Sequence, residues 1–220
     1  MNRDALSLLL KGADFFNLSL SPVTLSILDL YLIELQRWAL VFNLVGQHDT
    51  TTVIRRHIFD SLAISHLLPF RGSFVDLGSG AGFPGFILAA LDPGRKCVLI
   101  EARRKRANFL RAVTRTTGIK NIIVREGRAE YLSKLSGLAS EFNVVTTRAT
   151  WNTSQFLEFS SPFLKVDGIA LAMQGPRKAG STLMADADWH ALGFDLENTH
   201  DYPLPFGEGD RCALVFRKRA

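Results

Sequence analysis

The first 70 residues of the chain carry hydrophobic positions at helical spacing. Between residues 25 and 42, apolar side chains recur at alternating intervals of three and four, so they share one face of a helix. Ser21 and Pro22 directly precede this stretch, and serine as the cap with proline in the first turn is typical of a helix start. Thr51 or Thr52 is expected to cap a further helix that runs to residue 66. The pattern therefore predicts a helical N-terminal portion.

Beyond residue 69, short apolar runs alternate with amphipathic stretches. The apolar runs predict strands at residues 73–77, 97–101, 121–125, 142–147, 169–174 and 211–216, with a weaker one near Phe194. Helices are predicted at about 83–91, at about 128–138 and in a basic stretch ending near 117, and loops at 175–180 and 202–210. This alternation predicts an α/β fold, with a mainly parallel sheet of seven strands covered by helices on both faces. We expect residues 71–220 to form one compact unit on which residues 1–70 pack as a helical extension.

Length and composition limit the kinds of protein this chain can be. Its 220 residues suit one full-sized domain, and 47% of them are hydrophobic, enough for a substantial core. The longest apolar run, at 86–91, has six residues, whereas a membrane-spanning helix needs roughly 20. The first twelve residues include an acid and too short an apolar stretch for a secretory signal. We therefore expect a cytoplasmic monomer without membrane contact.

Cysteine and histidine usage argues against a metal site or a disulfide framework. The two cysteines, Cys97 and Cys212, each fall inside a predicted strand and are expected to be buried thiols. The five histidines have no ligand spacing, and a structural zinc would also need paired cysteines. No metal cofactor is expected.

Positive charge is concentrated in one segment. The whole chain has a net charge of +5, but residues 95–128 contain eleven Lys or Arg against two Glu, a balance of +9. Arg104, Arg111 and Arg115 lie within about 40° of one another on a helical wheel, opposite the apolar positions of the same helix. A packed helix with such a cationic ridge is typical of proteins that bind a polyanion such as RNA. A solvated helix face is the alternative.

A glycine-rich turn follows the first predicted strand, in the sequence VDLGSGAGFPG. Gly78, Gly80 and Gly82 allow a ligand to approach the backbone at the carboxyl end of the sheet, and residues 80–85 match the GxGxxG pattern of dinucleotide-binding proteins. Asp76 ends the strand directly under the turn, where its carboxylate would repel a diphosphate and attract a ligand with an ammonium and a sulfonium. The turn therefore favours S-adenosylmethionine over NAD as the cofactor.

Two acidic positions further along suit the rest of such a ligand. Glu101 ends the second predicted strand, nineteen residues beyond Gly82, where a carboxylate can accept hydrogen bonds from both ribose hydroxyls. Ala129 and Glu130 follow the third strand, where the edge of an adenine would be recognised. An ordinary acid at a helix N-terminus is the alternative interpretation of Glu101.

The fourth predicted strand ends at Thr146-Thr147-Arg148-Ala149, next to the expected position of a transferred methyl group. It has neither the Asn-Pro-Pro-aromatic motif favoured for methylation of base amino groups nor a cysteine for methylation of a pyrimidine carbon. A nucleophile with a lone pair, such as guanine N7, needs neither device, because direct displacement depends mainly on alignment. We expect Arg148 to be the catalytic residue, facing the methionine carboxylate, a phosphate or guanine O6. A surface arginine at a strand end is the alternative.

These features together resemble a known family. The turn VDLGSGAGFPG, Glu101 with the later Lys105-Arg106, the motifs RAE at 128–130 and TRA at 147–149, and the upstream blocks WALVFNL and RHIFDS are similar to the bacterial small-subunit rRNA guanine-N7 methyltransferases, once called glucose-inhibited division protein B. The similarity runs from about residue 20 to 180. It implies a Rossmann-like class I S-adenosylmethionine-dependent methyltransferase that modifies N7 of a guanine in the 530 loop of 16S rRNA. The implied partner is 16S rRNA or an assembling small ribosomal subunit.

The resemblance also implies which residues form the site. Those implied around the cofactor are Gly78, Phe83, Ala129, Glu130 and Arg148. Those implied around the substrate are Asn43, Arg56, His57 and Ser61. The family usually has Lys-Gly after the fifth strand, whereas this chain has Gln174-Gly175. Either Lys178 supplies the missing cation, or the substrate contacts differ.

Three other functions explain less of the sequence. A small-molecule methyltransferase would account for the glycine-rich turn but not for the +9 segment. An oxidoreductase on the same sheet is disfavoured by Asp76, which would meet a diphosphate. A non-catalytic RNA-binding protein is disfavoured because the chain keeps both Asp76 and Glu101.

Overall fold

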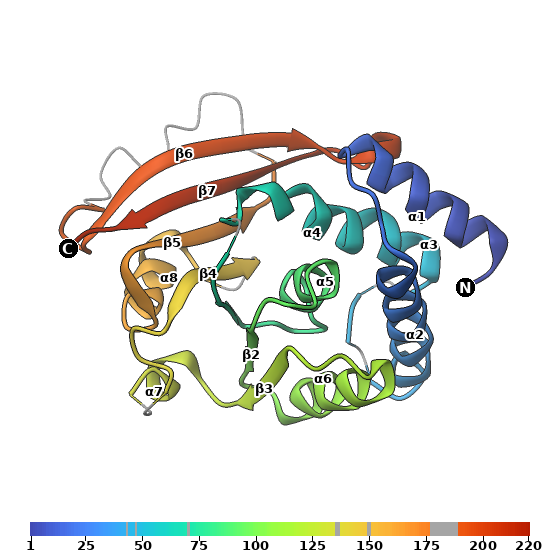
Figure 1. Ribbon diagram of the computed structural model, residues 1–220, viewed down its shortest axis with the longest axis horizontal. Coiled ribbons are helices and arrows are strands. Elements are labelled where there is room, and N and C mark those ends of the chain that lie inside the picture. Colours follow the sequence, from blue (N-terminus) through green and yellow to red (C-terminus); the bar gives the residue numbers. More distant parts are fainter. Residues whose placement is uncertain (43, 47, 70, 135–136, 149–150, 177–188) are drawn as a thin grey trace.

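A seven-stranded sheet forms the centre of the protein in a computed structural model that describes residues 1–220 except 43, 47, 70, 135–136, 149–150 and 177–188 (Figure 1). The strand order is β3-β2-β1-β4-β5-β7-β6. The strands are β1 (Phe74–Leu77), β2 (Cys97–Glu101), β3 (Ile122–Glu126), β4 (Phe142–Arg148), β5 (Leu164–Gln174), β6 (Phe194–Pro203) and β7 (Asp210–Lys218). The first five strands pair in parallel, and β7 runs antiparallel to both β5 and β6. The predicted mainly parallel α/β sheet is confirmed.

Helices lie before the first strand and between the parallel strands. The N-terminal ones are α1 (Arg3–Phe15), α2 (Pro22–Ala39), α3 (Thr50–Val53), a π-helical turn (Ile54–Ile58), α4 (Phe59–Ala63) and a 3-10 turn (Ser65–Leu67). The later ones are α5 (Gly85–Leu91), α6 (Arg104–Thr117), α7 (Ala129–Leu132), α8 (Thr153–Ser160) and a 3-10 turn (Pro205–Gly207). None of the helices in the described part of the chain combines the length and the hydrophobicity needed to span a membrane.

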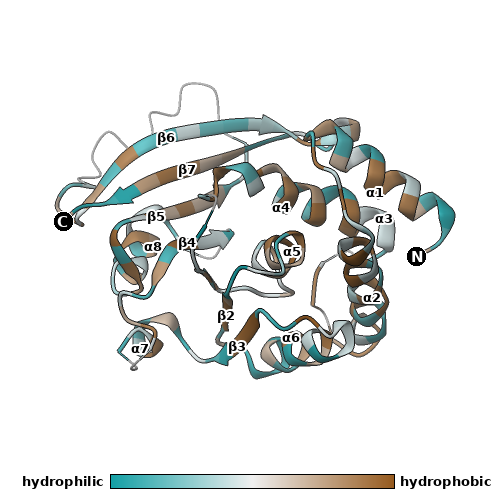
Figure 2. Cartoon of the chain, viewed as in Figure 1, coloured by the Kyte–Doolittle hydropathy of each residue, from teal (hydrophilic) through white to brown (hydrophobic). Residues whose placement is uncertain are grey.

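Two hydrophobic clusters cover the two faces of the sheet. Along β4, Val144 belongs to one cluster and Val145 to the other, as expected when successive side chains of a strand point to opposite faces. The first cluster packs α1, α2, α4, α5 and α6 on the sheet, and the second packs α7 and α8. In Figure 2, α5 is mostly brown, which fits a helix enclosed between the sheet and the N-terminal helices. Cys97 and Cys212 are both buried, as predicted.

The N-terminal helices share the core of the sheet domain. Ser21 caps α2 by accepting a hydrogen bond from Thr24, with Pro22 in the first turn, as predicted. Tyr31 on α2 is fully buried, stacks on Phe86 of α5 and donates a 2.6 Å hydrogen bond to the carbonyl of Ala81. Helix α2 therefore packs on the turn that follows β1 and stabilises it.

Several predicted element limits are wrong. Asp49, and not Thr51 or Thr52, caps α3, because its carboxylate accepts the N–H of Thr52 at 2.9 Å. The helix predicted at 128–138 ends at Leu132, and Gly137 has a φ angle of +80°, outside the helical range.

Other errors concern the second half of the sheet. β6 continues to Pro203 through residues predicted as loop, because an edge strand bonded only to β7 needs no continuous apolar pattern. Helix α8 was not predicted. It begins at a cap, Asn152, whose side chain accepts the N–H of Gln155.

Candidate active site at the carboxyl ends of the parallel strands

The turn between β1 and α5 is built on glycine. Gly78, Gly80 and Gly82 have φ angles of 68°, 58° and 99°, a range that other residues rarely adopt. A side-chain carbon at Gly82 would lie 2.8 Å from Cβ of Phe86. Gly82 therefore permits close packing of the turn on α5, whereas Gly78 and Gly80 line cavities beside it.

Asp76 lies inside β1, and its side chain is fully buried. Its Oδ1 accepts a 2.9 Å hydrogen bond from the Thr146 hydroxyl, and its Oδ2 accepts a 3.2 Å bond from the N–H of Gly85. Asp76 lines neither cavity at this edge of the sheet. Its carboxylate instead joins the glycine-rich turn to β4. A contact between Asp76 and the ammonium group of a ligand stays a prediction.

Burial raises the pKa of Asp76 to about 6, and the hydrogen bonds from Thr146, Ser79 and Gly85 oppose that rise. Because the pKa is higher in the folded than in the unfolded protein, this group favours folding at low pH. The contribution is lost as the pH rises through the range from about 4 to 6. Keeping the ionised carboxylate buried then costs about 3 kcal/mol.

Replacing Asp76 by asparagine is expected to remove this pH dependence, since the amide stays neutral and still bridges Thr146 and Gly85. The free energy of unfolding of the wild type, relative to that of Asp76→Asn, should fall by roughly 2 kcal/mol between pH 4 and pH 7. Urea unfolding at the two pH values measures this. Asp14→Asn, at an exposed aspartate of α1, should behave like the wild type. Equal pH dependence in the wild type and Asp76→Asn would contradict the expectation.

Glu101, at the end of β2, is 4% exposed and connects the glycine-rich turn to the start of α6 by hydrogen bonds. Its Oε2 accepts the N–H of Gly80 and its Oε1 accepts the N–H of Arg103, each at 2.8 Å. It also lines a cavity of about 320 Å³, hereafter the first cavity, together with Gly78 and Trp151. Each carboxylate oxygen has a second lone pair, so Glu101 keeps acceptor capacity at this wall.

Ala129 and Glu130 form another wall of the first cavity. The Oε2 atom of Glu130 is buried and has no hydrogen-bond partner among the described residues. A buried carboxylate oxygen without a donor is costly unless a ligand supplies one. The first cavity thus offers one acidic group at each of two walls, which suits a ligand with several N–H or O–H donors.

A second cavity, of about 430 Å³, adjoins the first and shares Gly78, Arg103 and Arg106 with it. Its remaining wall includes His57 from the π-helical turn, Phe83 from the glycine-rich turn and Arg148 from the end of β4. The two cavities therefore form a continuous row along the carboxyl ends of β2, β1 and β4.

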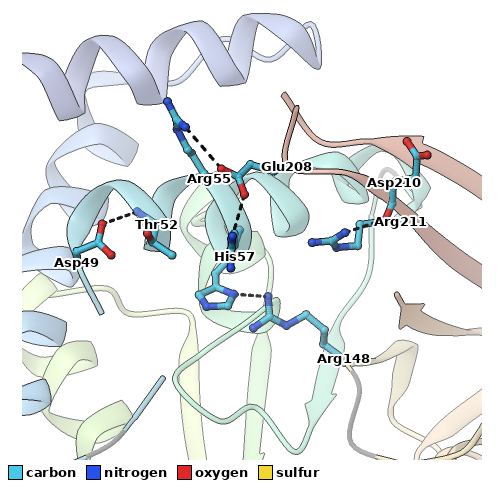
Figure 3. A network of polar contacts seen from close by, with 9 residues as sticks. Asp49, Thr52, Arg55, His57, Arg148, Glu208, Asp210 and Arg211 are labelled. Atoms are coloured by element: carbon cyan, nitrogen blue, oxygen red, sulfur yellow. Dashed lines mark hydrogen bonds and ion pairs between the residues drawn. The ribbon is translucent and has the colours of Figure 1, made fainter. Parts of the chain in front are cut away.

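Arg148 is held in the second cavity from three sides, and Figure 3 shows one of them, the contact with His57. Its Nη1 donates to Nδ1 of His57 at 3.0 Å and lies 3.5 Å from Oδ2 of Asp60. Its guanidinium carbon lies 5.0 Å from the centre of the Phe83 ring, within range of a cation–π contact. The hydroxyl of Tyr202 on β6 donates to the other oxygen of Asp60 at 2.8 Å. Residues of the N-terminal helices, His57 and Asp60, thus fix the orientation of this arginine, and Tyr202 of β6 holds Asp60 in place.

The charges in this cluster follow from burial. Burial, together with the nearby Arg148 guanidinium, lowers the pKa of His57 to about 3, so the ring is neutral and accepts from Arg148. Burial raises the pKa of Asp60, while Arg148 and the Tyr202 hydroxyl act in the opposite direction. Arg148 is therefore the cationic group of the cluster, and the Asp60 carboxyl lies 3.5 Å from it.

A π-helical turn places His57 at the cavity. Residues Ile54–Ile58 widen the helix between α3 and α4, and such turns are frequent at functional sites. The His57 ring lies 5.0 Å from that of Phe83, and the Ser61 hydroxyl donates to the His57 carbonyl at 2.8 Å. Ser61 is fully buried and lines neither cavity. Its contact with the site is the hydrogen bond to the backbone of His57.

Other predicted site residues lie outside the two cavities. Arg56 does not line the second cavity and pairs with Glu208 at 3.0 Å. Arg104, Arg111 and Arg115 are exposed on α6, opposite the buried face, as predicted. Asn43 and Lys178 lie outside the described residues. Gln174, where the family usually has lysine, donates to the Thr153 hydroxyl at 2.9 Å and so holds the start of α8.

Sequence reasoning missed several residues of the site, three of them with large side chains at the cavities. Arg103 and Arg106 line both cavities, and Trp151 lines the first. The run Arg103-Arg104-Lys105-Arg106 directly after Glu101 carried the signal, but the helical wheel selected the outward-facing arginines instead. Among the described residues, no group of three or more His, Cys, Asp or Glu is placed to hold a metal ion.

Solved structures resemble this chain in fold. The structure of M. jannaschii TYW2 in complex with AdoMet matches with a TM-score of 0.56 at 15% identity, covering 74% of this chain and 76% of that one. The structure of MtNAS in complex with MTA and tNA matches with a TM-score of 0.60 at 16% identity, covering 87% and 71%. With its strand order and antiparallel β7, the sheet is that of the class I, Rossmann-like S-adenosylmethionine-dependent methyltransferases.

Sequence comparison is more specific. The family model GidB, described as rRNA small subunit methyltransferase G, matches residues 24–203. The "Ribosomal RNA small subunit methyltransferase G" of Halorhodospira halophila is 33% identical over 201 residues, which cover 91% of each chain. The protein of the same name from Polynucleobacter asymbioticus is 36% identical over 191 residues, covering 84% of this chain and 85% of the relative. The chain therefore belongs to the GidB family of rRNA small subunit methyltransferases G.

Proposed function

We propose that this chain transfers a methyl group from S-adenosylmethionine to N7 of a guanine in the 530 loop of 16S rRNA. The observation that carries the proposal is the row of two adjoining cavities in a chain of this family, one walled by Glu101 and Glu130, the other by Arg148. The substrate is 16S rRNA, free or in an assembling small ribosomal subunit.

The residues of the first cavity fit the cofactor. Glu101 has acceptor capacity for ribose hydroxyls, and the unpartnered oxygen of Glu130 suits the amino group of an adenine. Gly78 lets a ligand pass close to the backbone between the two cavities. When bound, S-adenosylmethionine supplies an electrophilic methyl group on a sulfonium.

The residues of the second cavity fit a guanine. Its N7 has a lone pair and no proton to lose, so the chain needs to orient the base more than to deprotonate it. Arg148 is the donor we assign to guanine O6, beside N7. Neutral His57 and the Asp60 carboxyl keep the guanidinium fixed without adding a second cation. The role of these residues is therefore alignment.

Cofactor and substrate are tested separately. Titration calorimetry is expected to show binding of S-adenosylmethionine and of its demethylated product, and no binding of NAD. Tritiated methyl groups should then appear in 16S rRNA or small ribosomal subunits. Tight binding of NAD without S-adenosylmethionine would overturn the cofactor assignment. Transfer to a small acceptor from a cell extract, but not to rRNA, would favour a small-molecule methyltransferase.

The cationic ridge on α6 is expected to bind the RNA backbone. Arg104 begins the helix at the cavity edge, and Arg115 lies about 16 Å further along the helix axis. Replacing Arg104, Arg111 and Arg115 together by glutamine should weaken rRNA binding and flatten its salt dependence, since each lost phosphate contact reduces the slope by roughly one unit. Affinity for S-adenosylmethionine should stay within about twofold.

A matched control variant removes three positive charges outside α6. Arg3, Lys11 and Lys165 are exposed and lie on α1 and β5. Their triple glutamine variant should keep the wild-type salt slope. If the ridge variant also keeps that slope, the three arginines form an ordinary solvated face. Arg111 forms a 2.9 Å ion pair with Glu126, so it should contribute least of the three.

A further inference from the structure

An exposed aromatic ring lies near the active site without any role in the two cavities. Phe206, in the 3-10 turn between β6 and β7, is 48% exposed. Its backbone has a φ angle of +61°, a left-handed conformation that is uncommon for a bulky residue. The ring packs against Phe59 of α4, with the ring centres 6.0 Å apart. The turn thus holds a large apolar side chain partly in solvent.

One arginine contacts this ring, and a second binds the carboxylate that follows the same turn. The guanidinium carbon of Arg55 lies 5.4 Å from the ring centre, and Arg55 and Arg56 both pair with Glu208 from the same turn, at 3.6 and 3.0 Å. Because one carboxylate faces two guanidinium groups, this trio has a net charge of +1. Figure 3 shows Arg211 extending from β7 toward the helix that carries these arginines.

The turn is also continuous with the active site. Arg55 and Arg56 immediately precede His57 in the π-helical turn, and His57 contacts Arg148 in the second cavity. Tyr202 of β6, four residues before Phe206, hydrogen-bonds to Asp60, which in turn contacts Arg148. A ligand that occupies the second cavity and extends past His57 would reach this turn.

We propose that Phe206, with Arg55 beside it and Arg56 bound to Glu208 after the same turn, is a stacking platform for an unpaired base of the RNA next to the target guanine. The inference rests on the proposed function, because it concerns how the same RNA is held. An aromatic face binds any base, and guanidinium groups around it bind the neighbouring phosphates. A target base presented from a loop or swung out of its stack leaves its neighbour unstacked, and such a base needs a surface of this kind.

The test separates stacking from apolar contact. Phe206→Leu keeps an apolar side chain against Phe59 but removes the aromatic face, whereas Phe206→Tyr keeps the face. The dissociation constant for 16S rRNA should rise about tenfold in Phe206→Leu and change less than about twofold in Phe206→Tyr. Phe15→Leu, at another exposed phenylalanine on α1, should bind as the wild type does. Unchanged melting temperature and S-adenosylmethionine affinity control for folding.

Measurements of binding and of methyl transfer distinguish the two proposals. Equal rRNA affinity in the wild type and Phe206→Leu would overturn the platform. So would an equal loss for fully paired duplex RNA, which offers no unstacked base. Methyl transfer to rRNA by the wild type is measured in parallel and decides the proposed function independently. Weaker rRNA binding by Phe206→Leu and not by Phe206→Tyr shows stacking of RNA on Phe206, and methyl transfer to rRNA then shows that the stacked base neighbours a target guanine.

Discussion

Replacement of Arg148 by alanine is expected to reduce methyl transfer to rRNA by at least about 100-fold, the effect typical of losing a preorganised donor. Arg148 is the cation of the second cavity, and three groups fix it there: His57, Asp60 and Phe83. Without it, a guanine in the cavity loses the donor that we assign to O6. The fold should persist, because the side chain ends in a cavity and leaves no gap in either hydrophobic cluster.

The lysine variant tests why the residue is an arginine. A lysine keeps the charge but has no planar fork with which to contact His57 and a guanine at once, so Arg148→Lys should restore only a small part of the activity. Arg125→Ala, at an exposed arginine on β3, is the matched control and should keep its activity. Near wild-type turnover in Arg148→Ala would place the reacting base elsewhere.

Replacement of Glu101 by glutamine is expected to weaken binding of S-adenosylmethionine at least about tenfold. The amide nitrogen cannot accept, so one of the N–H groups of Gly80 and Arg103 loses its acceptor, and a hydrogen bond to a charged group stabilises by about 1.5–3 kcal/mol. Both loops that line the cavities are affected, and the acceptor for a ribose hydroxyl weakens as well. Titration calorimetry measures the change.

The neighbouring strand offers a matched control. Glu126 pairs in register with Glu101 at the end of β3, but its side chain faces Arg111 on the surface. Glu126→Gln should leave the affinity for S-adenosylmethionine unchanged. If Glu101→Gln and Glu126→Gln lose equal affinity for S-adenosylmethionine, the loss comes from removing a negative charge at this edge of the sheet and not from the hydrogen bonds of Glu101.

Local sequence patterns predicted much of the sheet and of the first cavity. A sequence pattern records which residues are neighbours along the chain. Such neighbours determine strand β2, the helix cap at Ser21 and the positions of Gly78 and Glu101. Asp76 shows the limit of this reasoning. Its place in the strand was predicted, but the direction of its carboxylate is set by Thr146 and Gly85.

The second cavity depends on contacts that no local pattern contains. Arg148 meets His57 across 91 positions of sequence, and Asp60 meets Tyr202 across 142. The π-helical turn that orients His57 was not predicted either, since its sequence continues a helical pattern. The resemblance implied His57 and Arg148 separately, and only the fold shows that they touch. Asp60 and Tyr202 were not implied as site residues at all.

Methylation of N7 of one guanine in small-subunit rRNA can be detected at the level of single nucleotides. Small ribosomal subunits that lack this modification are incubated with the protein and S-adenosylmethionine, and their RNA is cleaved with borohydride and aniline at N7-methylguanine. Primer extension is predicted to show one new stop, in the 530 loop, that is absent with Arg148→Ala and without S-adenosylmethionine. Methyl label in the RNA without any new stop, or a stop that Arg148→Ala retains, would contradict the account.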